Sequence, residues 1–250
     1  LGTTLSQAVS VAIALAVIIK RKLISVERSD FVLRREIVLP VLKIGFPVAM
    51  QDGFIQISFI LITIIANRRG LADAAAVGIV EKIMSFMFLV PSSMLSTVSA
   101  LASQNIGAKK YDRANSTLRF AAFIATGFGL TMAVLIQFSA SSFVALFTAD
   151  SAVVLLGAQY LRGYIWDCFL GGIHFSFSGY FCALGKSGIS FLHNLLSIVL
   201  VRVPGAYFMS KLFPENLFPM GIATACGSLL SVIVCVTAFC ILRKNKNFRL

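Results

Sequence analysis

The stretch SQNIGAKKYDRA occupies residues 103–114 and lies between two long apolar segments. It ends a run of apolar and small residues, places Gly107 where a helix commonly stops, and continues with three basic residues. In a soluble protein this pattern is typical of a helix C-terminus, where glycine ends the helix and cations interact favourably with its dipole. Because the neighbouring segments are long and apolar, we interpret it as a membrane helix ending at a cytoplasmic loop.

The composition of the chain excludes most soluble classes. Of its 250 residues, 58% are hydrophobic and 13% are charged, whereas soluble domains carry about 25% charged residues. The net charge of +12 does not indicate nucleic-acid binding, because the basic residues form no continuous patch or aromatic-lined groove. The sequence therefore predicts an all-α, polytopic membrane helix bundle, with the lipid bilayer as its partner and no nucleic acid.

Seven segments are apolar over about 20 residues, the length that crosses a bilayer. The predicted spans cover residues 2–19, 41–66, 75–104, 117–139, 152–183, 188–210 and 220–242. Pro47, Pro91 and Pro204 fall inside spans and are predicted kinks. The chain has no signal-peptide pattern at its start, and we expect it to be a fragment of a longer protein.

The distribution of basic residues predicts the orientation of the spans. Sixteen of the 22 Lys and Arg residues lie on one side, in the loops 20–43, 107–119 and 185–187 and in the tail after residue 242. Three lie on the other side. This asymmetry predicts a multi-pass protein of the plasma (cytoplasmic) membrane, with the N-terminus of the chain outside and its C-terminus in the cytoplasm.

Three acidic residues lie within predicted spans, on stripes of polar or small residues. The stripes are Asp52, Gln56 and Thr63; Glu81, Ser85, Ser92, Ser96, Ser99 and Ser103; and Asp167, Gly171, His174 and Ser178. Intervals of three, four and seven residues place each set on one helix face. Such stripes also serve as packing surfaces between membrane helices. An acid at mid-membrane costs about 2.5–3.5 kcal/mol, so we expect these acids to face a hydrophilic cavity or a partner.

The candidate cavity residues are therefore Asp52, Asp167, Glu81, His174, Gln56 and Trp166. His174 lies roughly 10 Å from Asp167 along the helix and can join a proton relay, or simply bond a neighbouring helix. Trp166 offers aromatic surface to a ligand or to helix packing. Glu81 precedes Lys82, so a structural ion pair is the alternative to a role in transport.

No enzyme signature accompanies these residues. The sequence GKS at 185–187 lacks the first glycine of a phosphate-binding loop and has no preceding strand, and no HExxH or GxSxG occurs. The five cysteines lie in apolar segments without a CxxC pair and are predicted to be inert. We therefore expect a protein that is not an enzyme and has no cofactor or resident metal.

The segment QNIGAKKYDRA, residues 104–114, resembles the Q-N-x-G-A-x-x-x-x-R-A segment of MATE (multidrug and toxic compound extrusion) transporters. There it ends the eighth of twelve helices, and Gly45-Phe46-Pro47, Glu81-Lys82 and Gly185-Lys186-Ser187 agree in order. The resemblance implies that residues 1–40 hold the last helix of a preceding bundle and a basic inter-lobe loop. Residues 41–250 would form a six-helix C-terminal transport lobe, whose partner is a missing N-terminal six-helix lobe.

The resemblance implies an antiporter that exports drugs or cationic organic compounds by alternating access, coupled to H⁺ or Na⁺. In this family the C-lobe cation site uses acids of the seventh and tenth helices, and Asp52 and Asp167 lie in the matching spans. Either could hold Na⁺ or a proton, with Glu81 and His174 as supporting residues.

Two other functions fit the pattern less well. A flippase for lipid-linked oligosaccharides, from the same superfamily, should have a cavity rich in arginine to hold phosphate, whereas these spans carry only Lys82, Arg162 and Arg202. A membrane receptor or scaffold without transport would not need ionisable groups on three separate helices.

Overall fold

The computed structural model describes residues 2–20, 32 and 34–244, and no strand occurs among them. The predicted all-α class is confirmed. Residues 21–31 and 33 of the predicted basic loop 20–43 lie outside the described residues, as does the tail beyond Lys244. Residues 35–43 were expected in this loop but belong to the long helix Arg35–Asn67. The chain divides into two compact units, Leu1–Val41 and Leu42–Leu250, which are described separately below.

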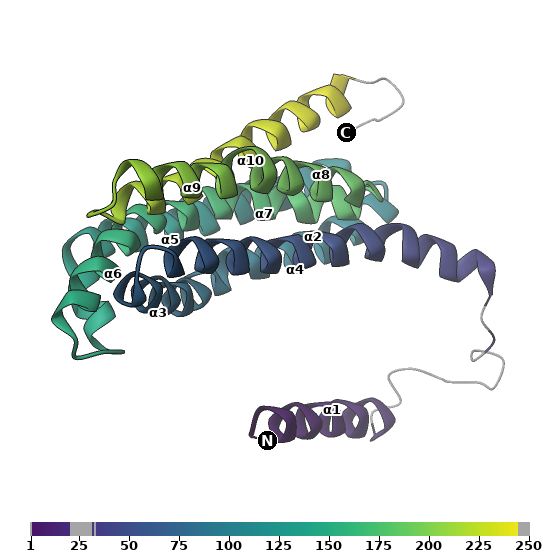
Figure 1. The fold of residues 1–250 in the computed structure, drawn as a ribbon. Coiled ribbons are helices and arrows are strands. Elements are labelled where there is room, and N and C mark those ends of the chain that lie inside the picture. Colours follow the sequence, from purple (N-terminus) through teal and green to yellow (C-terminus); the bar gives the residue numbers. More distant parts are fainter. Residues whose placement is uncertain (1, 21–31, 33, 245–250) are drawn as a thin grey trace. The chain divides into compact units, whose positions relative to one another are not determined.

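From α2 onward the helices follow one another with connections of a few residues (Figure 1). They are α1 (Gly2–Lys20), α2 (Arg35–Asn67), α3 (Leu71–Met87), α4 (Leu89–Gly107), α5 (Tyr111–Ala145), α6 (Ser151–Tyr164), α7 (Trp166–Ala183), α8 (Ser187–Ser197), the π-helical turn η2 (Ile198–Arg202), α9 (Val203–Leu212) and α10 (Phe218–Lys244). The first unit contains α1 and the start of α2, and the second contains the remainder.

The membrane-spanning character of the chain rests on its long apolar helices. Four are long and apolar enough to cross a bilayer: α2, α5, the continuous run Ser187–Leu212, and α10. The pair α3 and α4, bent by 41°, makes a fifth if it counts as one span. The total of seven spans therefore stays a prediction.

Two of the three prolines that were expected to kink their spans lie beside irregular helix segments. Pro91 is the third residue of α4, just after the bend between α3 and α4. Pro204 directly follows the first residue of α9, after the π-helical turn. Since proline cannot donate the backbone hydrogen bond of a regular helix, both positions suit a departure from regular α-helix geometry. At Pro47, in contrast, α2 continues without interruption.

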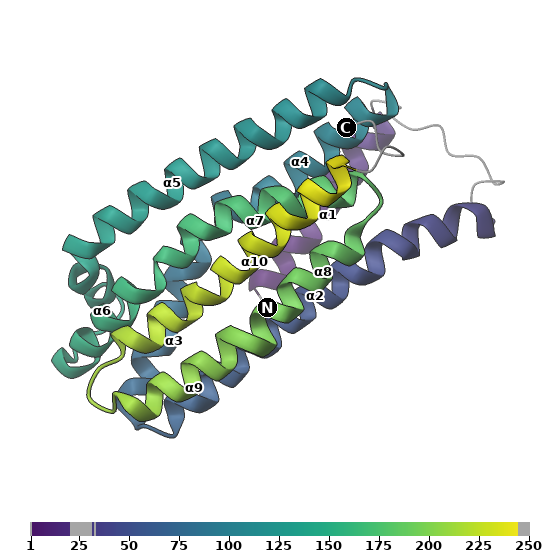
Figure 2. The same cartoon turned by 90° about the horizontal axis from the view of Figure 1, so that it is seen from above.

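The central helix of the second unit is α7, which packs against α4, α5, α8 and α10. Figures 1 and 2 show α4, α5, α7 and α10 lying side by side. Two glycines allow α5 and α7 to approach closely: a Cβ at Gly129 would lie 2.6 Å from the carbonyl oxygen of Cys168, and one at Gly172 would lie 2.7 Å from the carbonyl carbon of Ala125. Small residues at such contacts are common in membrane bundles.

The outer faces of several helices are apolar. On α5, for example, the side chains of Phe120, Phe123 and Phe138 are 68%, 78% and 86% exposed. Inside, apolar side chains are accompanied by buried polar ones, including Asp167 and His193. This arrangement is expected where lipid covers the outside and polar groups mark functional sites inside.

The segment 103–114 forms a tight helix-ending turn. As expected, α4 ends at Gly107, but the residue in the left-handed conformation is Lys109, with φ 57°. The N–H of Lys110 donates to the carbonyl of Asn105 at 2.8 Å, and the N–H of Lys109 donates to that of Ile106 at 2.9 Å. These are the two bonds of a Schellman motif, which satisfies carbonyls that a helix end leaves open.

A second structural tie joins the ends of α2 and α9. The guanidinium of Arg69 donates to the backbone carbonyls of Ser210, Phe213 and Pro214 at 2.7, 3.0 and 2.6 Å. Its Nε also lies 3.0 Å from Asp73. Arg69 therefore fixes the turn between α2 and α3 against the loop that follows α9.

Candidate functional site

A cavity of about 280 Å³ lies where α2, α3, α7, α8, η2 and α10 converge. Helices distant in the sequence contribute its polar lining, which includes Gln56, Glu81, Asp167, His174, Asn194 and Arg202. Because both acids and the arginine come from different helices, the cavity exists only when the bundle is folded.

Asp167 is the most deeply buried acid of this cavity. It stands in the first turn of α7, which begins after the interruption at Ile165, and it is 0% exposed. The free N–H groups and the dipole at a helix start favour a negative charge there. One carboxylate oxygen, Oδ2, lies 3.5 Å from Nη1 of Arg202. The break between α6 and α7 thus gives Asp167 both a favourable field and a counter-charge.

Arg202 is held by contacts from several helices. It is the last residue of η2 and is 9% exposed. Its Nη2 donates to the hydroxyl of Tyr164 at 2.5 Å, and its guanidinium carbon lies 5.2 Å from the ring centroid of Phe59 and 5.5 Å from that of Tyr164. Aromatic faces attract a desolvated cation. These contacts fix the guanidinium beside Asp167.

Glu81 supplies the second carboxylate. Both of its oxygens lie 3.5 Å from Oγ1 of Thr63, whose hydroxyl also donates to the carbonyl of Phe59 at 2.9 Å. Within the described residues Glu81 forms no ion pair with Lys82. Two carboxylates and one guanidinium therefore line one cavity, which carries a net charge of about −1 when both acids are ionised.

Several buried polar atoms of the lining have no hydrogen-bond partner in the described part of the chain. They are Nδ1 of His174, Nδ2 of Asn194, Nε of Arg202 and both carboxylate oxygens of Asp167. Most buried polar atoms in proteins are satisfied by protein or water. This concentration of unsatisfied atoms indicates a site that takes water or a polar ligand.

A histidine pair extends the polar region away from the acids. The rings of His174 and His193 are 5.8 Å apart, and Nε2 of His193 lies 2.8 Å from the hydroxyl of Ser178. His174 is therefore both part of the cavity lining and adjacent to a hydrogen-bonded histidine on α8, which is compatible with either role considered for it from the sequence.

The structure brings together four of the six candidate residues: Gln56, Glu81, Asp167 and His174. Asp52 lies elsewhere, in a groove of about 620 Å³ between α2 and α4. Trp166 packs against the apolar core of the unit. The predicted polar face of α7 thus contributes Asp167 and His174 to the cavity, whereas the neighbouring tryptophan points into apolar surroundings.

Two predicted stripes are divided between the cavity and the groove. Along α3 and α4, Glu81, Ser85 and Ser92 line the cavity, whereas Ser96, Ser99 and Ser103 line the groove. On α2, Gln56 belongs to the cavity and Asp52, one turn away, belongs to the groove. The two hollows therefore follow the same helices and succeed each other along them.

Sequence reasoning missed Arg202, Tyr164 and Asn194 as members of the site. Arg202 was visible as a basic residue inside a span, and a buried arginine needs an acidic partner. That requirement could have linked it with one of the three acids. Asn194 was likewise visible as a polar amide inside a predicted span, where it needs a hydrogen-bond partner on another helix, whereas Tyr164 gave no comparable signal.

Comparison with known proteins identifies the family. The MatE family model matches residues 47–208. The probable multidrug resistance protein YoeA of Bacillus subtilis (strain 168) is 24% identical over 176 residues, which are 70% of this chain and 38% of that protein. The probable multidrug resistance protein YpnP of the same organism is 26% identical over 224 residues, which are 88% of this chain and 49% of that protein.

Solved structures share the fold. A MATE protein in the straight conformation superposes with a TM-score of 0.84 at 19% identity, covering 95% of this chain and 55% of that one. The Vibrio cholerae MATE transporter VcmN in the bent form gives a TM-score of 0.82 at 18% identity, covering 94% and 53%. The chain belongs to the MatE family and is a multi-pass membrane protein. It spans less than half the length of YoeA and YpnP.

Proposed function

We propose that this chain is one lobe of a cation-coupled antiporter that exports drugs or cationic organic compounds by alternating access. The observation that carries the proposal is the cavity in which Asp167 and Glu81 face the single guanidinium of Arg202. The relatives named as probable multidrug resistance proteins support the same class of substrate.

The charge of the cavity suits exchange of one cation for another. Arg202 compensates one carboxylate, so one monovalent cation neutralises the remainder. In a poorly polarisable interior this interaction is much stronger than in water. A substrate cation and the coupling ion then compete for the same negative charge, and the binding of one weakens the binding of the other. Competition of this kind is sufficient to couple the two fluxes.

The coupling ion is H⁺ or Na⁺. A proton needs only a carboxylate, whereas Na⁺ would take oxygen ligands from Asp167 or Glu81 together with the side chains of Asn194 and the cavity serines. Among the described residues no group of three or more His, Cys, Asp or Glu side chains could hold a metal. In the groove, Asp52 is the acid that meets an entering cation first and passes it to the cavity.

Transport by alternating access needs a second lobe. In this proposal residues 41–250 form the C-terminal transport lobe, and an N-terminal six-helix lobe completes the pathway. The excess of basic residues in alternate loops supports an orientation in the cytoplasmic membrane with the C-terminus in the cytoplasm and the N-terminus of this chain outside.

The two alternative functions fit the cavity less well. A flippase for lipid-linked oligosaccharides must hold phosphate, yet the single arginine of this cavity faces two carboxylates. A receptor or scaffold that does not transport has no need for unsatisfied polar atoms converging from several helices. Both alternatives predict that no fluorescent cation is moved.

The decisive experiment is transport by the full-length protein in liposomes. An imposed pH or Na⁺ gradient should drive the accumulation of a fluorescent cation such as ethidium, and dissipating each gradient separately identifies the coupling ion. Asp167→Asn, Glu81→Gln and Asp52→Asn are the test variants. The matched control is Asp112→Asn, which removes an exposed acid at the start of α5. If the cavity variants Asp167→Asn and Glu81→Gln transport like the control, the proposal is wrong.

A further inference from the structure

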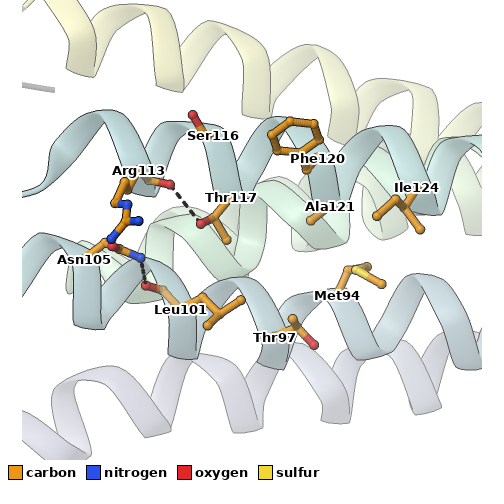
Figure 3. Close-up of a pocket in the computed structure, with 10 residues that line it drawn as sticks. All are labelled: Met94, Thr97, Leu101, Asn105, Arg113, Ser116, Thr117, Phe120, Ala121 and Ile124. Carbon is orange, nitrogen blue, oxygen red and sulfur yellow. Dashed lines mark hydrogen bonds between the residues drawn. The ribbon is translucent and has the colours of Figure 1, made fainter.

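A groove of about 520 Å³ lies between α4 and α5 (Figure 3). It shares no lining residue with the cavity or with the groove of Asp52. All of its lining residues belong to these two helices. None of them lines the cavity that we assign to transport. The groove between α4 and α5 is therefore a feature of its own, separate from the transport cavity.

The groove has a polar end and an apolar end. Figure 3 shows Arg113 and Asn105 together at one end and Met94 and Ile124 at the other. Eleven residues separate these positions on each helix, which corresponds to a length of about 16 Å. This is close to half of the hydrocarbon core of a bilayer, which is about 30 Å thick. The groove therefore has the length of one leaflet.

The side walls of the groove are apolar and face outward. Phe120 and Ile124 on α5 are 68% and 56% exposed, and Leu101 on α4 is 46% exposed. Ala121, only 7% exposed, lies between the helices. Outward-facing phenylalanine, isoleucine and leucine are the usual lipid-contacting residues of a membrane helix. The walls suit a hydrocarbon chain rather than a water-soluble ligand.

The polar end provides a cation and hydrogen-bond donors. The guanidinium of Arg113 makes no ion pair or hydrogen bond within the part of the chain that the structure describes. In Figure 3 it extends from α5 toward Asn105 on α4. Asn105 uses one amide N–H to bond the carbonyl of Leu101 at 2.7 Å, so its second N–H is available. Arginine has five N–H donors suited to phosphate oxygens.

The chain around the polar end is also basic. Lys109, Lys110 and Arg119 flank Arg113, and Asp112 is the single acid in the segment 107–119. Under the positive-inside rule this end lies at the cytoplasmic surface, where anionic lipids are concentrated. A charge of this sign at this depth favours a negatively charged headgroup.

We infer that the groove between α4 and α5 binds an anionic glycerophospholipid. Its phosphate contacts the guanidinium of Arg113 and the amide of Asn105, and one acyl chain lies along the apolar walls toward Met94 and Ile124. The proposal requires the membrane-spanning fold and does not depend on whether, or what, the protein transports.

Native mass spectrometry of the purified full-length protein in detergent tests this inference. Dioleoylphosphatidylglycerol and dioleoylphosphatidylcholine have the same acyl chains, but only the former carries a net negative charge. We expect the protein to retain the anionic lipid preferentially. Arg113→Ala should weaken its binding at least about tenfold, the effect of losing one hydrogen bond to a charged group. Lys110→Ala, which removes a charge from the same loop but does not line the groove, should change it much less.

A further variant and a further ligand distinguish binding in the groove from lipid adsorbed elsewhere on the protein surface. Thr97→Trp places a large side chain on an exposed lining position and should reduce the retention of both lipids, while thermal unfolding verifies that the variant is folded. sn-Glycerol 3-phosphate, which has a phosphate but no acyl chains, should not compete with the lipid. Equal losses for Arg113→Ala and Lys110→Ala, effective competition by the chain-free phosphate, or unchanged retention by folded Thr97→Trp would each overturn the inference. The last result would mean that another segment of the protein covers the groove.

Discussion

Asp52 and Asp167 look alike in the sequence and lie in very different surroundings. Each is the one acid of an apolar segment, on a stripe of polar or small residues. Asp167 is completely buried, stands at the start of a helix and faces Arg202 at 3.5 Å. Asp52 is exposed in the middle of α2 and makes no ion pair within the described residues. An acid in a membrane helix therefore marks a functional candidate, and its neighbours decide how it can act.

The energetic consequences of the two positions differ accordingly. Removing one partner of a buried ion pair leaves an uncompensated charge and costs about 3–5 kcal/mol. An exposed carboxylate can be replaced with a change within about 0.5 kcal/mol. The cavity residues should therefore couple stability and transport, whereas Asp52 should affect transport without affecting stability.

The largest effect is expected for Arg202→Met. This change leaves Asp167 and Glu81 facing each other without a cation, and it should lower the stability of the protein by about 3–5 kcal/mol. Thermal unfolding in detergent measures the loss, and Lys82→Met, which removes an exposed cation on α3, is the control. The double variant Asp167→Asn with Arg202→Met should recover much of the loss. Equal melting of Arg202→Met and Lys82→Met would show that the buried pair is unimportant.

The second effect concerns transport by Asp167→Asn and Asp52→Asn. Asp167→Asn keeps the shape of the side chain and removes a charged contact worth about 1.5–3 kcal/mol, so coupled transport should fall by about 10- to 100-fold. Asp52→Asn removes an exposed charge without a counter-charge and should reduce the rate by about fivefold or less. Initial rates in liposomes measure both. Equal losses would remove the distinction between the cavity and the groove.

A smaller difference should appear in the chemical accessibility of the two positions. In a background without native cysteines, Asp52→Cys should react readily with a negatively charged methanethiosulfonate reagent. Asp167→Cys should react at least about tenfold more slowly, because thiol modification requires access. Rapid labelling of Asp167→Cys in the resting protein would mean that the cavity opens far more than the structure indicates.

The smallest effect on transport is expected when single serines of the stripe along α3 and α4 are replaced by alanine. Ser92→Ala lies in the cavity and Ser99→Ala in the groove, and neither should change stability by more than about 0.5 kcal/mol. Ser92→Ala should alter the apparent affinity for the transported cation by about twofold or more, since it removes a polar group beside the bound cation. Ser99→Ala should leave the affinity unchanged. The opposite ranking would place the binding site in the groove.

The helical stripes show how far the sequence could predict the site. Residue spacing predicts that Asp167 and His174 share one polar face of α7, and both residues line the cavity. Residue spacing predicts one surface along α3 and α4, but the structure divides it between two hollows. The division falls inside α4, between Ser92 and Ser96, and not at the 41° bend near Phe88. Residue spacing defines a helix face, whereas the helices packed opposite that face decide which hollow each residue lines.

Residue spacing along a helix could not predict that Asp167 and Arg202 form an ion pair. Arg202 closes a π-helical turn, in which the residue spacing differs from that of an α-helix, and the two residues are 35 positions apart in the chain. Similarly, the end of α4 at Gly107 followed from the motif, but the left-handed conformation at Lys109 did not, because a lysine gives no local signal for it.

Local sequence patterns are enough to predict an all-α membrane protein with acids on polar helix faces. Hydrophobic length, the excess of basic residues in alternate loops and residue spacing along a helix are local properties, and they can be read without a fold. The contact of Asp167 with Arg202 in a buried cavity, and the place of Asp52 in an open groove, depend on how the helices pack. The reason is that burial and counter-charges come from other helices, which are positioned through the bend at Phe88 and the irregular turns at Ile165 and η2.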